Sequence, residues 1–364
     1  MSEQGENQMG EAEVGTDPRN RREPREAARG SGSSRDDPAP PVDPPPGPGR
    51  YGPALRAVAL ATVAVAYLEV VLGDTVRVTQ SGMGCRSWPL CNGHLGLVGN
   101  LHALLEQSHR YMAAIVTILV VSTFVLARRH ARRDRLVYRG AALGLALIAL
   151  QVALGALTVL AHNAGWTVAL HLTGAWLLVG TATLTAIGAW QGPQSLRRPG
   201  PAGAAGLVAV ASLLVLAVSG MLVLHGGASR ACPAWPVCAG GVGPPGLVAL
   251  QYLHRSLALV ASVAIAVAAV RAWRSPALRP TSRVLASGVL GLLCGTVGAG
   301  ALVATTGAPA VWQDLHLVLA SALWVATVAL ATPHVRARPG TPEAATAAAA
   351  SPGASRSVGT DRAR

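Results

Sequence analysis

Four histidines and four cysteines of the sequence form two sets of the same order, Cys-Cys-His-His. The sets are Cys85, Cys91, His109 and His171 in the first half of the chain, and Cys232, Cys238, His254 and His316 in the second. The two histidines of each set are 62 residues apart (171 − 109 = 62 and 316 − 254 = 62). This repeat indicates an internal duplication that keeps side chains able to bind metals or, for the cysteines, to form disulfides.

The histidine pairs are suited to hold haem. Two imidazoles that face one another from neighbouring helices can bind the iron of a planar haem from both sides. A bare metal ion is a poorer candidate, because two histidines leave a transition-metal site short of ligands. We therefore predict that His109 and His171 bind one haem iron, and that His254 and His316 bind another.

Each cysteine pair encloses five residues, Arg-Ser-Trp-Pro-Leu in the first loop and Pro-Ala-Trp-Pro-Val in the second. Disulfides persist in loops that face an oxidising compartment, so one interpretation is a structural disulfide, Cys85–Cys91 and Cys232–Cys238. The other is a redox-active disulfide, which applies better to Cys85 and Cys91, since exposed or strained disulfides are the reducible ones. Zinc is disfavoured, because a structural zinc site needs four ligands and each loop supplies two.

The two halves differ three residues before the first histidine of each set. Glu106 precedes His109 on the same helical face, whereas Gln251 stands before His254. A carboxylate beside a bound macrocycle can accept a proton or stabilise positive charge, and an amide cannot accept the proton. We predict that Glu106 is catalytic, with the first half reacting and the second holding a cofactor. The alternative is an acid at a helix start that complements the helix dipole.

Other charged residues lie near the same helix ends. Glu69 is a weaker candidate for a reacting carboxylate, and Leu216 stands at its loop-aligned position in the second half. Haem propionates need cationic partners near the water interface, and Arg77, Arg110 and Arg255 are candidates for that role. Anchoring of these arginine side chains at the membrane surface is the equally open interpretation.

Membrane-spanning helices must position these side chains. Hydrophobic residues make up 51% of the chain and charged residues 13%, and the mean hydropathy is +0.40, as is typical of membrane proteins. A bilayer core needs about 20 apolar helical residues. Eight apolar stretches approach this length, at about 53–73, 110–127, 139–161, 167–190, 205–225, 255–273, 284–306 and 314–332. The predicted fold is an all-α integral membrane protein of two pseudo-symmetric four-helix bundles, residues 53–190 and 205–332.

Arginines indicate the orientation in the membrane. They cluster after the second, fourth, sixth and eighth apolar stretches and are few in the alternate connections. By the positive-inside rule, both termini are cytoplasmic and both cysteine loops lie outside the cell membrane. The formal charge of +13 is therefore explained by arginines that set the orientation of the chain in membrane lipid. Binding to nucleic acid is not expected.

Three segments lie outside the predicted bundles. Residues 1–50 are rich in proline, glycine and charged residues with few large apolar side chains, which predicts a disordered cytoplasmic tail. Residues 333–364 are predicted to be a second such tail. Residues 191–204 are predicted to be a cytoplasmic linker between the two halves.

These residues lie in a pattern that resembles the haem A synthase family. In the first half the similar segments are Val76-Arg-Val-Thr-Gln-Ser-Gly82, Cys85, Trp88-Pro-Leu-Cys91, Glu106-Gln-Ser-His109-Arg110, Gln151-Val-Ala-Leu-Gly155 and His171-Leu. In the second half they are His225, Ala228-Ser-Arg-Ala-Cys232, Trp235-Pro-Val-Cys238, His254-Arg255 and His316-Leu. The resemblance covers about residues 53–332, and Asp74 departs from it where a glycine is common.

The resemblance implies an enzyme that converts haem O to haem A for terminal oxidase assembly, by oxidising a porphyrin methyl group to a formyl group. It implies a haem b cofactor on His254 and His316, substrate haem between His109 and His171, and catalysis by Glu106. It also implies delivery of haem O by a haem O synthase in the same membrane. An electron-transfer partner is required but not identified, and no particular oligomeric state is indicated.

Two other classes of protein fit the same histidines. One is a di-haem b-type membrane electron carrier, in which neither haem is altered. The other is a haem-transfer or assembly protein, whose cysteine pairs would be exchange partners. The electron carrier gives no reason for Glu106 in one half against Gln251 in the other.

Overall fold

Eight long helices account for most of the residues that the computed structural model describes, which are 51–96, 99–196, 198–275 and 280–337. Their bounds are α1 Pro53–Val78, α2 Leu101–His130, α3 Arg135–Leu160, α4 Gly165–Gln191, α5 Pro201–His225, α6 Pro245–Arg274, α7 Thr281–Thr305 and α8 Ala310–Ala331. All eight are long and apolar enough to span a membrane. The prediction of an all-α membrane protein is confirmed, and the predicted tail 1–50 lies outside the described residues.

α2 and α6 begin earlier than the apolar stretches predicted, at Leu101 and Pro245. Asn100 caps α2, because its side-chain oxygen accepts hydrogen bonds from the next backbone N–H groups, at 2.9 and 3.2 Å. Proline suits the start of α6, where its missing N–H has no helical partner to lose. These early starts place His109 and His254 about two turns inside their helices.

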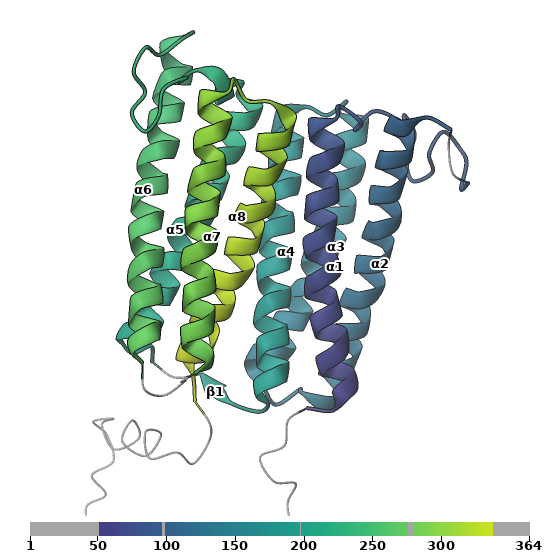
Figure 1. Ribbon diagram of the computed structural model, residues 1–364. Helices are drawn as coiled ribbons and strands as arrows, with labels where there is room; N and C mark the ends of the chain where they lie inside the picture. Colours follow the sequence, from purple (N-terminus) through teal and green to yellow (C-terminus); the bar gives the residue numbers. More distant parts are fainter. Residues whose placement is uncertain (1–50, 97–98, 197, 276–279, 338–364) are drawn as a thin grey trace, which may run out of the picture. The chain divides into compact units, whose positions relative to one another are not determined.

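The first half of the chain (α1–α4) and the second half (α5–α8) meet along α4 and α8 (Figure 1). Within the halves, the consecutive pairs α1–α2, α3–α4, α5–α6 and α7–α8 pack together. Between the halves, α8 contacts α1 and α4, and α4 contacts α5. The described residues of four connections, 79–96 with 99–100, 161–164, 226–244 and 306–309, lie at one end of the bundle, which we call the cysteine-loop end.

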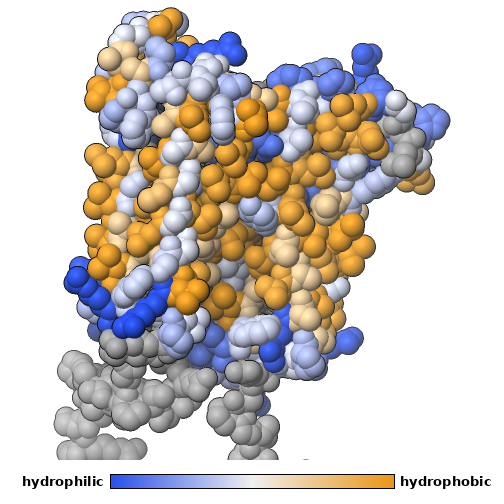
Figure 2. All heavy atoms as spheres, viewed as in Figure 1, coloured by the Kyte–Doolittle hydropathy of each residue, from blue (hydrophilic) through white to orange (hydrophobic). Residues whose placement is uncertain are grey.

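Apolar side chains cover the sides of the helices between two more polar ends (Figure 2). Large exposed ones lie on lipid-facing positions of several helices, among them Leu60, Ile118, Val208, Val260 and Val284. The last turns of α2 and α6, at the end opposite the cysteine loops, carry Arg128, Arg129, Arg271 and Arg274. Contact of such an apolar surface with lipid is favourable, whereas its contact with water is not, so the chain is a multi-pass membrane protein.

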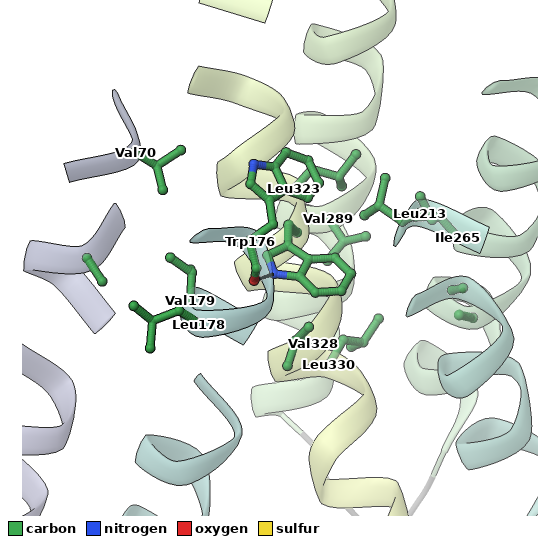
Figure 3. Packing of buried hydrophobic residues seen from close by; sticks show 14 of the residues in the cluster. Val70, Trp176, Leu178, Val179, Leu213, Ile265, Val289, Leu323, Val328 and Leu330 are labelled. Atoms are coloured by element: carbon green, nitrogen blue, oxygen red, sulfur yellow. Dashed lines mark hydrogen bonds between the residues drawn. The ribbon is translucent and has the colours of Figure 1, made fainter. Parts of the chain in front are cut away.

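Figure 3 shows the apolar core where the two halves meet. Trp176 of α4 and Trp324 of α8 stack with their ring centroids 5.7 Å apart. The Nε1–H group of Trp324 also donates to the carbonyl oxygen of Trp176 at 2.9 Å. Gly180 leaves room for this ring, since a Cβ atom there would lie 2.8 Å from it. Close approach at small residues is the usual way in which membrane helices pack.

A short strand pair ties the linker to the end of α8. β1 (Ser195–Leu196) pairs antiparallel with β2 (Arg336–Ala337), and the turn η3 (Thr332–Val335) connects α8 to β2. Regular structure therefore continues past residue 333, where the C-terminal tail was predicted to begin, because backbone pairing with β1 holds this segment. Residues 338–364 lie outside the described residues.

Candidate haem-binding sites

The four repeated histidines lie on the even-numbered helices, near the cysteine-loop end, and each ring packs against a glycine of the preceding helix. The pairs are Gly73–His109, Gly155–His171, Gly220–His254 and Gly300–His316. A Cβ atom built on these glycines would lie 2.9, 3.4, 3.2 and 3.0 Å, respectively, from Cε1 of the histidine. A Cβ atom would therefore crowd the rings of His109, His254 and His316, whereas at Gly155 it would make an ordinary contact with His171.

The histidines pair within each half as predicted from their spacing. His109 of α2 and His171 of α4 are near enough to interact electrostatically, and so are His254 of α6 and His316 of α8. In the described residues, no group of three or more histidine, cysteine or acidic side chains could hold a metal ion. Two imidazoles per half fit axial ligation of a haem iron better than a bare ion.

In the second half, each histidine forms a hydrogen bond through Nδ1, which leaves its other ring nitrogen, Nε2, available to bind a ligand. His316 Nδ1 lies 2.9 Å from the carbonyl oxygen of Thr296, which only accepts, so the proton is on Nδ1 and the lone pair is on Nε2. His254 Nδ1 lies 2.8 Å from Ser219 Oγ, and that hydroxyl donates to the Leu216 carbonyl at 2.7 Å. Haem-ligating histidines are commonly oriented in this way, so the second half fits a haem.

The first half holds its two histidines differently from the second. His109 Nδ1 lies 2.9 Å from Glu69 Oε1 of α1. Neither His109 Nδ1 nor His171 Nδ1, both of which are buried, forms a hydrogen bond among the described residues. His109 is therefore close to a carboxylate and His171 is not, whereas hydrogen bonds hold both histidines of the second half.

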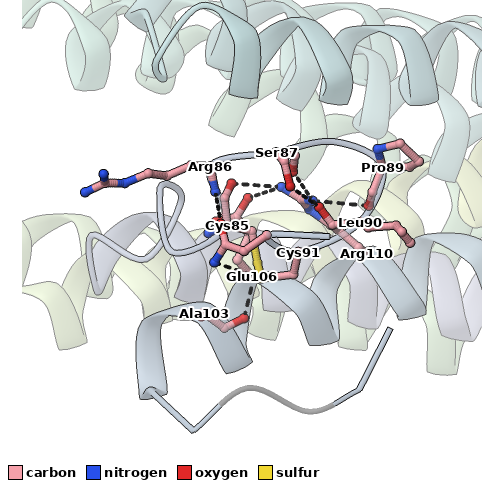
Figure 4. Close-up of polar contacts among 10 residues, drawn as sticks. Cys85, Arg86, Ser87, Pro89, Leu90, Cys91, Ala103, Glu106 and Arg110 are labelled. Atoms are coloured by element: carbon pink, nitrogen blue, oxygen red, sulfur yellow. Dashed lines mark hydrogen bonds and ion pairs between the residues drawn. A yellow bond between two sulfur atoms is a disulfide. The ribbon is translucent and has the colours of Figure 1, made fainter. Parts of the chain in front are cut away.

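Glu106 is buried and joins α2 to the first cysteine loop (Figure 4). Its Oε2 accepts a hydrogen bond from the backbone N–H of Cys85 at 2.7 Å, and its Oε1 pairs with Arg110 at 2.6 Å. Both carboxylate oxygens thus have donors, and the loop lies directly over the helix turn that carries His109. The predicted catalytic carboxylate also anchors this loop.

Arg110 and Arg255 hold the two cysteine loops in the same way. Arg110 donates to the carbonyl oxygens of Cys85 at 3.2 Å and Ser87 at 2.7 Å. Arg255 donates to those of Cys232 at 2.8 Å and Ala234 at 2.6 Å. The sequence did not indicate these contacts, which occupy guanidinium groups that were predicted to meet propionates.

Both loops are closed by disulfides, Cys85–Cys91 and Cys232–Cys238. All four cysteines are buried, the most exposed at 5%. Gln251 takes the place of Glu106 in the second half, where its amide donates to the Ala228 carbonyl at 2.9 Å. Glu106 therefore accepts hydrogen bonds where Gln251 donates one, and only Glu106 brings a charge to its loop.

Arg77 links the two halves at the cysteine-loop end. Its Nε–H donates to Asp74 Oδ1 at 2.6 Å, and an Nη1–H donates to Gln313 Oε1 of α8 at 3.2 Å. Asp74 is buried and also interacts with Asp314 of α8. The residue that departs from the family pattern thus pairs with an arginine that was predicted to meet a propionate.

Sequence reasoning missed the glycines opposite the histidines, although their repeat is visible. Gly155 and Gly300 are 145 residues apart (300 − 155 = 145), as are His171 and His316 (316 − 171 = 145). Gly73 and Gly220 are 147 apart (220 − 73 = 147), as are Cys85 and Cys232 (232 − 85 = 147). No signal of this kind marked Ser219 or Thr296, because a hydroxyl and a backbone carbonyl replace each other freely as acceptors.

Comparison with known proteins gives consistent matches. A family described as COX15-CtaA, cytochrome oxidase assembly protein, matches residues 98–328. "Heme A synthase" of Symbiobacterium thermophilum is 33% identical over 287 residues, which are 74% of this chain and 92% of the relative. "Heme A synthase" of Geobacillus thermodenitrificans is 32% identical over 232 residues, 59% of this chain and 71% of the relative. "Protoheme IX farnesyltransferase" of Thermus thermophilus is 30% identical over 284 residues, 73% of this chain but 46% of the relative.

Proposed function

Because this chain belongs to the COX15-CtaA family of cytochrome oxidase assembly proteins, we propose that it is a haem A synthase, an enzyme that oxidises a methyl group of haem O to the formyl group of haem A. The relatives named heme A synthase support this activity. The observation that carries it is the presence of two histidine pairs of equal design, of which only the first has a charged anchor, Glu106, above it.

The second half holds the resident cofactor, haem b, between His254 and His316. Its Nδ1 groups are both bound to neutral acceptors, Ser219 Oγ and the Thr296 carbonyl oxygen, so Nε2 of each ring is free for iron. A haem with two histidine ligands supplies one-electron transfer, since it has no open coordination position. The second cysteine loop, held by Arg255 and Gln251, covers this end of the half.

The first half holds the substrate, haem O, between His109 and His171. Glu106 acts there as proton acceptor or as the charge that stabilises a positive centre on the substrate. Its contacts with the Cys85 N–H and Arg110 fix the carboxylate and the loop as one unit. Arg110 remains beside the carboxylate throughout, so a proton taken up by Glu106 is exchanged next to a permanent positive charge.

The cysteine-loop end faces outward from the cell membrane, and both termini are cytoplasmic. The arginines in the last turns of α2 and α6 support this orientation, because basic residues gather at the cytoplasmic ends of spanning helices. Haem O reaches the first half within the membrane from a protoheme farnesyltransferase. Relatives that carry that name match this chain over 46% of their length, which supports joint action of the two activities.

The test is product analysis of full-length protein supplied with haem O. Bound haem is extracted and separated by chromatography, and the native chain yields haem A or a hydroxylated intermediate. Glu106→Gln keeps the size and shape of the side chain but removes the charge and one of its two acceptor oxygens, so we expect it to retain haem and lose product by at least about 100-fold. Gln251→Glu, the converse change in the second half, retains product.

The same extraction separates the other functions. Haem b alone, with haem O supplied, would support a di-haem electron carrier. Unchanged haem O that passes to an acceptor protein would support a transfer role. Product formation by Glu106→Gln at the native rate would refute the catalytic role of that carboxylate.

A further inference from the structure

Glu69 of α1 is a largely buried carboxylate that the proposed reaction does not use. Its side chain is 14% exposed, and Oε1 lies 2.9 Å from Nδ1 of His109. Its second oxygen, Oε2, is buried and has no hydrogen-bond partner among the described residues. Gly73 follows one turn later on the same helix, so one face of α1 both admits the His109 ring and meets its Nδ1 atom.

In the second half, uncharged groups contact the Nδ1 atoms of the two histidines. Ser219 Oγ and the Thr296 carbonyl oxygen accept from His254 and His316. The residue loop-aligned with Glu69 is Leu216, whose backbone carbonyl merely receives the Ser219 hydroxyl. His171 has no Nδ1 partner in the described part of the chain. Among the four candidate ligands, therefore, His109 alone faces a carboxylate there.

We propose that Glu69 is a positioning residue that makes His109 the most strongly electron-donating of the four histidines and so biases the substrate haem iron toward its ferric form. This inference rests on the proposed function, in which His109 binds that iron. The carboxylate lies 2.9 Å from Nδ1 without forming a hydrogen bond to it, and its negative charge raises the electron density on the ring. A hydroxyl or a carbonyl does so less, because neither carries a full charge.

Burial strengthens this effect. Glu69 has one close partner, and among the described residues no arginine or lysine pairs with its carboxylate, in contrast to Asp74, which pairs with Arg77. A charge that is neither neutralised nor fully solvated acts on its neighbour through a low effective dielectric constant. The two carboxylates of α1 thus differ in task, one holding an arginine and the other a histidine.

The experiment is a redox titration of the full-length protein in detergent, loaded with haem O and followed by absorbance of each haem. Glu69→Leu installs the residue of the second half, and Glu69→Gln keeps the shape without the charge. Ser219→Ala is the matched control, which removes the Nδ1 partner of His254 in the other half. Haem content is measured for every variant.

We expect Glu69→Leu to weaken the preference for ferric over ferrous iron in the first half about tenfold, which raises that potential by about 59 mV for one electron. Glu69→Gln should raise the same potential by a smaller amount. The potential can still be measured in this variant if Glu69→Leu fails to retain haem O. Ser219→Ala moves the potential of the second haem and leaves the first at its native value.

An unchanged first potential in Glu69→Gln and Glu69→Leu, with haem O bound, overturns the inference. So does loss of haem from Glu69→Leu combined with a native potential in Glu69→Gln, which would mark a purely structural role. His109→Ala separates this failure from a failure of the proposed function. If that variant binds haem O with the native spectrum, His109 is not a ligand, and the ligation itself is wrong.

Discussion

Substitution of a single glycine in α7 should weaken binding of the haem proposed for the second half without weakening the helix. A Cβ atom on Gly300 would lie 3.0 Å from Cε1 and 3.2 Å from Nδ1 of His316. Carbon atoms in contact prefer about 3.5–4.0 Å, so Gly300→Ala must move the ring by about 0.5 Å. The hydrogen bond from Nδ1 to the Thr296 carbonyl, 2.9 Å long, would stretch beyond the usual range of such bonds.

Disturbance of a ligand's orienting bond costs about 10–100-fold in metal affinity, or about 1.4–2.8 kcal/mol of binding free energy. Alanine is also a better helix former than glycine by about 0.5–1 kcal/mol. We therefore expect Gly300→Ala to lower the affinity for the haem proposed in the second half, while the apoprotein remains at least as stable as the native chain. Haem affinity falls while the stability of the apoprotein does not, so the two measurements distinguish loss of haem binding from misfolding.

The assay is haem titration of purified apoprotein by absorbance, with thermal unfolding measured in parallel. Gly298→Ala is the control, because that position lies in the same helix and has nothing within 4 Å of a built Cβ atom. Native haem affinity in Gly300→Ala would refute the role of the glycine gap. Equal haem loss in Gly298→Ala would show that helix composition, and not contact with His316, sets affinity.

Two further predictions concern the loops and the junction of the halves. Arg110→Ala removes bonds to the Cys85 and Ser87 carbonyls, each worth about 1.5–3 kcal/mol when the donor is charged. Reduction of Cys85–Cys91 by a small thiol should accelerate at least about tenfold, while reduction of the second disulfide keeps its rate. Trp324→Phe removes the bond to the Trp176 carbonyl and should cost about 1 kcal/mol. Trp324→Ala also leaves a cavity and should cost about 3–5 kcal/mol; equal melting temperatures for the three proteins would contradict this account.

The fold was readable from the sequence because lipid imposes a strong constraint. Backbone groups in a bilayer must bond within their own segment, so a long apolar stretch can only be a helix. Helix starts were less readable, since α2 and α6 begin at Leu101 and Pro245, before the His-Arg pairs at which the predicted apolar stretches began. The C-terminal boundary was misplaced for a similar reason, because backbone pairing of β1 with β2 leaves no hydrophobic signal.

The repeat of cysteines and histidines, and its failure at Glu106 and Gln251, were likewise properties of the sequence alone. Identical spacing in two halves of a chain predicts equal places in the fold, and residue type alone distinguishes an acid from an amide. These observations indicated haem, the family and the division of labour. They could not show that both cysteine loops are held by the arginine beside each histidine.

The tertiary structure decided how each histidine is oriented. The polar groups closest to three of the Nδ1 atoms come from neighbouring helices at sequence distances that differ between the halves: 40 residues for Glu69 and His109 (109 − 69 = 40), 35 for Ser219 and His254, and 20 for Thr296 and His316. A carboxylate, a hydroxyl and a backbone carbonyl serve one purpose, so no residue pattern marks them. The sequence determined which residues could bind haem, because ligand chemistry belongs to side-chain type; helix packing decided which ligand meets a charge, because that depends on distances in space.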